Sequence, residues 1–121
     1  MTTQTVQQQA NRAPKHPAPR SVPDTLAGFE VKDGEQVKKI LRQRPMLAPL
    51  LVEMMAEIHK HFPEAERVVL APEWESPGNL VARVITHVED AVASEERFDN
   101  AWTFPRWESH QGRLLLNVLA P

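Results

Sequence analysis

Three side chains that could bind a metal ion lie at helical spacing in the middle of the sequence. Glu53, Glu57 and His61 occupy positions i, i+4 and i+8, with His59 close by. Carboxylate and imidazole groups are ligands for transition metals, but one helix offers at most three of them, and the H-E-x-x-H spacing is missing. The alternative is a solvated face with an ordinary Glu57–His61 pair. We expect no metal or other cofactor and keep metal binding as an alternative.

His87 is the second candidate for chemistry, because it shares one face of an expected strand with Arg83. Glu73 or Glu75 on the facing strand could lie opposite, and a histidine beside a carboxylate can act as a general base. A cross-strand charge pair on an open sheet face is the commoner arrangement. The sequence has no nucleophile elbow, and none of its four glycines forms a phosphate-binding loop. We therefore name no catalytic residue and favour a non-enzymatic role.

An aromatic segment near the C-terminal end has the composition of a protein-interface hot spot. Trp102, Phe104, Arg106 and Trp107 fall within six residues, and tryptophan and arginine are enriched in such hot spots. The alternative is a cover over the core, because large aromatic residues of small domains are usually buried. Trp102 continues a helical stripe and should be core, whereas Trp107 should be exposed. These four residues are the candidate partner-binding site.

The first 25 residues differ in composition from the rest of the chain. They contain four prolines and the Gln7–Gln9 run but almost no large apolar side chain, so they cannot offset their ordering entropy. We predict a disordered Pro/Gln-rich tail over residues 1–25 and one folded domain over residues 26–121.

Charge and composition exclude several classes of function. The tail has three basic side chains and one acidic, whereas residues 26–121 have eleven basic and fifteen acidic, a net charge of −4. Nucleic acid is therefore an unlikely partner, because phosphate neutralisation drives such binding. The sequence contains no run of 18 apolar residues, which argues against a membrane-spanning helix. The chain has no cysteine, which fits a cytoplasmic location.

Hydrophobic spacing predicts two helices after the tail. Asp33 with Gln36 forms a capping-box pattern at the start of the first helix, which should end at Arg44 before Pro45. The second should open at Pro45 and end at Pro63. Its expected apolar face comprises Met46, Leu47, Leu50, Leu51, Met54, Met55 and Ile58.

The remaining elements are two strands, a helix and a last strand. Residues 67–71 and 80–86 form an expected hairpin around the turn residues 76–79. A third helix over residues 89–102 should bury Val92, Phe98 and Trp102, with Ala91 and Ala101 beside them and Ser94 as a competing N-cap. Residues 113–119 form the last strand. The order α-α-β-β-α-β predicts an α+β fold with a three-stranded, mainly antiparallel sheet and helices mostly on one face.

Three segments resemble a group of short uncharacterised bacterial and archaeal proteins. They are the helix ending in His61-Phe62-Pro63-Glu64-Ala65, the Phe98-Asp99-Asn100-Ala101-Trp102 segment and the closing strand after Gly112. The group shares a [YH]-F-P-x-A helix end and a later F-D-x-x-W segment; it tends to have a second tryptophan where this chain has Thr103. The resemblance covers residues 40–119 and implies the order of elements but no activity.

Three functions fit these observations. The favoured one is a small non-catalytic interaction or regulatory module, accessory or antitoxin-like, that binds another protein through the aromatic segment. A structural homo-oligomer, such as a homodimer formed at an exposed strand edge, is the first alternative. A small enzyme or metal-binding protein that uses His87 or the Glu53/Glu57/His61 face is the second.

Overall fold

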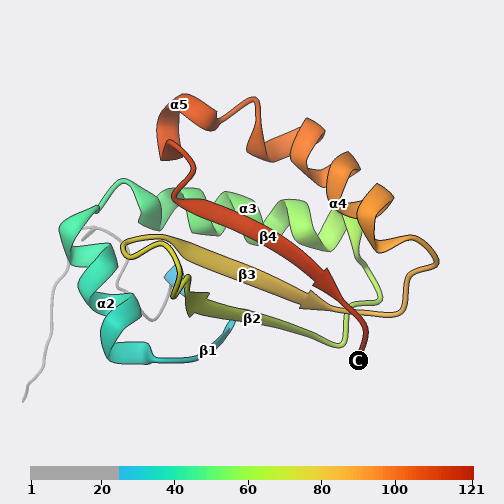
Figure 1. Cartoon of the computed structure of the whole chain (residues 1–121), viewed down its shortest axis with the longest axis horizontal. Helices are drawn as coiled ribbons and strands as arrows, with labels where there is room; N and C mark the ends of the chain where they lie inside the picture. Colours follow the sequence, from blue (N-terminus) through green and yellow to red (C-terminus); the bar gives the residue numbers. More distant parts are fainter. Residues whose placement is uncertain (1–24) are drawn as a thin grey trace, which may run out of the picture.

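A computed structural model describes residues 25–121, which form a four-stranded sheet with flanking helices (Figure 1). The α+β class is confirmed. The predicted tail lies outside the described residues except for Thr25. The elements in chain order are β1 (Glu30–Val31), α2 (Gly34–Gln43), α3 (Leu47–His61), β2 (Arg67–Pro72), β3 (Leu80–Ile85), α4 (Ala91–Phe98), the π-helix η1 (Asp99–Thr103), α5 (Trp107–His110) and β4 (Leu114–Leu119).

The sheet is mixed, with the strand order β1-β2-β3-β4. Only the β2–β3 hairpin is antiparallel; β1 pairs with β2, and β4 with β3, in parallel. The prediction of three mainly antiparallel strands is therefore wrong in strand count and in character. At the β4 edge the pairing is parallel because the long connection through α4, η1 and α5 returns the chain to the other end of the sheet. β4 then runs in the same direction as β3.

The core lies between one face of the sheet and the helices. α3 runs behind the sheet and α4 runs alongside β4 (Figure 1). Burying these apolar side chains is the main stabilising contribution to the fold. The sheet contributes Val68, Leu70, Leu80, Ala82, Val84, Leu114, Leu116 and Val118, and the helices contribute Val37, Ile40, Leu41, Leu47, Leu50, Leu51, Met54, Met55, Ile58, Phe98 and Trp102.

The starts of the first two helices differ from the prediction. Asp33 takes the N-cap position of α2 with a left-handed φ of 55° and makes no side-chain capping bond, so the capping-box prediction is wrong. α3 begins at Leu47 rather than Pro45, because a turn closed by the Leu47 N–H to Arg44 carbonyl bond (3.0 Å) precedes it. Met46 is consequently 53% exposed and does not join the apolar face.

α4 also corrects the predicted buried face of the third helix. Asp90, not Ser94, is the N-cap, and its side chain accepts a hydrogen bond from the Ala93 N–H at 3.0 Å. Val92 is 75% exposed. Val92 lies six residues before Phe98, which is a rotation of about 600°, or one and two-thirds turns. The two side chains therefore lie on different faces of the helix. Ser94, four residues before Phe98, is buried on the same face instead, and Ala101 is exposed.

The short strand β1 is tied to β2 by an ion pair. Arg67 donates two hydrogen bonds, of 2.7 Å each, to the two carboxylate oxygens of Glu30. These bonds hold the pKa of the Glu30 carboxyl below its ordinary value. The pair is exposed, so it defines the edge of the sheet more than it stabilises the domain. None of the helices in residues 25–121 is long and apolar enough to cross a membrane.

Candidate functional site

Trp102 forms the buried base of the aromatic segment. Its side chain is 1% exposed and lies with its ring 6.0 Å from the Phe98 ring, centroid to centroid. The His110 ring is parallel to it within 4° at 5.9 Å. The structure thus places Trp102 in the core, where the helical stripe put it. Trp102 supports the surface and does not form part of it.

His110 locks the segment by two hydrogen bonds and is 1% exposed. Its Nε2 lies 2.9 Å from the Thr103 carbonyl oxygen, and the Gly112 N–H donates to its Nδ1 at 3.0 Å. Both bonds form together when the neutral ring carries its proton on Nε2, because Nδ1 must accept. The sequence reasoning missed His110. A lone histidine two residues before a glycine gives no signal of such a role.

Arg106 connects the segment to α3. Its Nε donates to Glu53 Oε1 at 2.8 Å, and its guanidinium carbon lies 5.3 Å from the centroid of the Trp102 ring. A cation over an indole face is attracted by the ring quadrupole. Arg106 therefore has two roles: it covers the Trp102 ring, and it holds the aromatic segment against α3.

A π-helical turn explains why neighbouring aromatic residues face in opposite directions. In η1 the Phe104 N–H donates to the Asp99 carbonyl, five residues back, at 2.8 Å. The wider turn leaves Trp102 and Thr103 buried and Phe104 outside. Trp102 Nε1 and Thr103 Oγ1 have no hydrogen-bond partner among the described residues. Such turns are frequent at functional sites.

Phe104 and Trp107 are the exposed part of the segment. They are 55% and 46% exposed, and their ring centroids lie 6.3 Å apart. Trp107 begins the short helix α5, and its ring packs edge-on against His110 at 5.4 Å. Gly112, with φ of 76°, makes room for it: a Cβ there would lie 3.2 Å from the Trp107 ring. We call Phe104, Arg106 and Trp107 the aromatic ridge.

The carboxylates and histidine proposed as a metal site are used for other contacts. Glu53 binds Arg106, and Glu57 lies 3.0 Å from His61 Nε2 and 3.7 Å from Lys60 Nζ. The His61 ring packs edge-on against Phe98 at 5.5 Å. Within residues 25–121 no group of three acidic or histidine side chains converges on one point. The contacts are those of the ordinary helical pair that the spacing also allowed.

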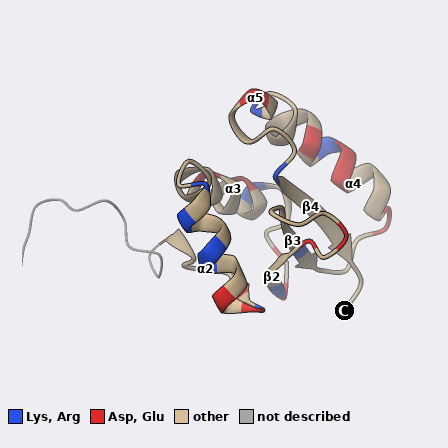
Figure 2. Cartoon of the chain, turned by 60° about the vertical axis from the view of Figure 1, so that its left-hand side comes forward, with Lys and Arg blue, Asp and Glu red and all other residues tan. Residues whose placement is uncertain are grey.

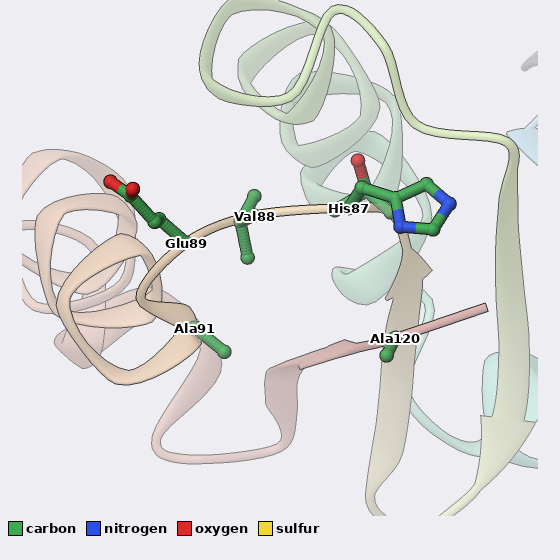
Figure 3. Close-up of a pocket in the computed structure, with 6 residues that line it drawn as sticks. His87, Val88, Glu89, Ala91 and Ala120 are labelled. Carbon is green, nitrogen blue, oxygen red and sulfur yellow. The ribbon is translucent and has the colours of Figure 1, made fainter.

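His87 lines a shallow pocket of about 290 Å³ beyond the carboxyl ends of β3 and β4 (Figure 3). Val88, Glu89, Ala91 and Ala120 line the same pocket. The sequence analysis placed Glu73 or Glu75 opposite His87, but the carboxylate beside it is that of Glu66, which lies 3.5 Å from His87 Nε2. The His87 side chain is 81% exposed, so water surrounds it.

Trp74 is a surface residue that the sequence reasoning missed. It lies in the loop between β2 and β3 and is 83% exposed. Because β4 is parallel to β3, this loop and the start of β4 lie at the same end of the sheet, where Arg113 donates to Asn79 at 3.3 Å. The available signal was its position between Glu73 and Glu75, since a tryptophan between two charges in a turn is poorly placed for burial.

Comparisons with protein-family models, with curated proteins and with solved structures find no match to this chain. The resemblance to the short bacterial and archaeal proteins therefore stays a hypothesis, and the function must be argued from the geometry.

Proposed function

We propose that the chain is a small non-catalytic interaction module, of an accessory or antitoxin-like kind, that binds another protein through the aromatic ridge. The observation that carries the proposal is the pairing of two exposed aromatic rings with a buried support. Phe104 and Trp107 stand outside, while Trp102 and His110 beneath them are each 1% exposed.

A supported aromatic surface favours affinity because little freedom remains to be lost on binding. Association costs free energy for each side chain that must be ordered. Trp107 is already packed on His110, and Arg106 is held by Glu53. Tryptophan and arginine fixed in this way have the properties of binding hot spots.

The enzyme alternative has less support. The pocket beside His87 is shallow and its histidine is exposed, whereas catalytic sites shift the properties of their residues by burial and by neighbouring charge. The Glu53/Glu57/His61 face is occupied by Arg106, Lys60 and Phe98.

A photo-crosslinking residue at position 104 tests the proposal in the native host. We expect one protein to be captured from position 104 and none from Met46, a control residue of similar exposure (53%) before α3. With the captured protein purified, Phe104→Ala and Trp107→Ala should each weaken binding about 30-fold or more, as hot-spot residues do. Met46→Ala should leave it unchanged. Circular dichroism must show that every variant is folded.

Equal binding by wild type and both ridge variants would contradict the proposal. So would equal capture from positions 104 and 46, because exposure alone would then explain it.

A further inference from the structure

Two arginine side chains from distant parts of the sequence meet over one glycine of the β2–β3 loop. A Cβ built on Gly78 would lie 3.3 Å from Arg113 Nη1, 3.9 Å from Arg44 Nη2 and 4.0 Å from Arg44 Nε. Outside the adjacent chain, these guanidinium nitrogens are the three heavy atoms nearest to that position. Gly78 has a φ of 91°, which side chains rarely adopt, and its missing Cβ leaves the space open. We call this space, between Arg44, Gly78 and Arg113, the two-arginine hollow.

Three segments position the hollow at one end of the sheet: the end of α2, the β2–β3 loop and the start of β4 (Figure 1). Arg44 follows α2, and its N–H donates to the Ile40 carbonyl at 2.9 Å. Arg113 directly precedes β4, and its carbonyl accepts from the Leu80 N–H at 2.8 Å. The Arg113 guanidinium also donates to Asn79 Oδ1 at 3.3 Å. The backbones of both arginines are thus fixed before any ligand arrives, which lowers the cost of binding.

Neither guanidinium has a carboxylate partner in the part of the chain that the structure describes. The ion pairs within 4.0 Å all involve other residues. Glu73 and Glu75 belong to the same loop as Gly78, but neither lies within that distance of Arg44 or Arg113. Two positive charges that share one hollow repel each other unless an anion lies between them. The hollow therefore favours an anionic ligand.

The distribution of charge over the helices favours an anion at the same end. α2, which leads to Arg44, carries three basic side chains and one acidic; α4 and η1 carry three acidic and one basic. Figure 2 shows α2 and α4 on opposite sides of the molecule. A surface potential of one sign raises the local concentration of ligands of the other sign. Anions are therefore attracted to the α2 side and repelled from the α4 side.

We propose that the two-arginine hollow binds a dianionic phosphate group, either a free phosphate ion or the phosphate of a monoester. Each guanidinium offers parallel N–H donors that match two oxygens of a phosphate. At neutral pH such a phosphate carries close to two negative charges, which balances two arginines. A carboxylate or a nucleic-acid phosphodiester carries one and leaves one arginine without a counter-charge.

The hollow includes no residue of the aromatic ridge, so phosphate binding is independent of the proposed protein contact. Its donors are side chains from positions 44 and 113, brought together only by folding. A glycine-rich loop, by contrast, binds phosphate through consecutive backbone N–H groups. This difference explains why the sequence carries no phosphate-binding motif.

Titration of the full chain with inorganic phosphate, followed by NMR at constant ionic strength, tests the site. We expect saturable shifts of the Gly78 and Asn79 amide signals and of the Nε–H signals of Arg44 and Arg113. A second titration with phenyl phosphate distinguishes the two sources. Tighter binding than that of inorganic phosphate supports a monoester ligand, and equal or weaker binding supports the free ion.

Arg44→Gln and Arg113→Gln should each weaken phosphate binding about tenfold or more, because each removes charge-assisted hydrogen bonds to the phosphate. Arg42→Gln is the matched control, since it removes the same charge from α2 two residues before Arg44. It should bind phosphate with the affinity of wild type. Dispersed amide signals must show that every variant is folded, and Arg44→Gln alone suffices if Arg113→Gln is not.

Three results would overturn the proposal. The first is the absence of a saturable shift at the highest phosphate concentration at which the protein stays in solution. The second is a loss of affinity in Arg42→Gln equal to that in Arg44→Gln, because net charge alone would then explain binding. The third is acetate binding as tight as phosphate binding, since the hollow would then accept the carboxylates of an acidic protein segment.

Discussion

Replacing Trp102 by alanine is expected to lower the free energy of unfolding by about 3–5 kcal/mol, the range for removing a large aromatic side chain from a core. Trp102 is 1% exposed, and it contacts Phe98, His110 and Arg106. Its loss leaves a cavity and removes the support of the aromatic ridge. The free energy of unfolding of a domain of this size is about 5–15 kcal/mol in total, so the variant should be close to unfolding in water.

Urea denaturation followed by circular dichroism measures this effect. Trp74→Ala is the control, since an 83% exposed side chain should change stability by about 0.5 kcal/mol or less. If the two alanine variants lost similar stability, the assignment of Trp102 to the core would be wrong.

The second large effect is expected at His110. His110→Phe keeps an aromatic ring against Trp102 but removes both hydrogen bonds, which leaves the Thr103 carbonyl and the Gly112 N–H without their partner. Leaving a buried group unpaired costs about 1–3 kcal/mol, so the two groups together give an expected loss of about 2–6 kcal/mol. The same denaturation experiment measures it.

His59→Phe provides the comparison, because His59 is on the exposed side of α3 and should change stability little. If the His110→Phe variant were as stable as wild type, ring stacking on Trp102 alone would be enough to stabilise the aromatic segment. The hydrogen bonds at 2.9 and 3.0 Å would then contribute nothing net.

Local pattern was enough to predict most helices and strands. The stripe Leu47–Ile58 and the hairpin strands repeat at 3.6 and 2 residues, and the structure contains both. β1 could not be predicted in this way, because two residues carry no period and their pairing with β2 depends on contacts nearly forty positions away. The parallel β3–β4 pair also arises from tertiary arrangement, through the connection that joins these strands.

The candidate site was predicted in composition but not in geometry. Clustered aromatic residues drew attention to residues 102–107, yet the π-turn that separates buried Trp102 from exposed Phe104 has no simple sequence pattern. The Arg106–Glu53 contact spans 53 positions, and the His110 bonds depend on backbone groups rather than on side-chain types. Such contacts become visible only when the chain is folded.

The connection between β3 and β4 also sets an expected order of events as the chain folds. The β2–β3 hairpin closes a short loop, whereas β4 can pair with β3 only after 28 intervening residues have been brought together. Closing the longer loop costs more entropy, so hairpin contacts should form early and β4 should dock late. Pulsed hydrogen exchange should therefore protect β2 and β3 amides before those of β4, and simultaneous protection would contradict this order. The aromatic ridge lies within that connection, so it would acquire its fixed shape only in the final kinetic step.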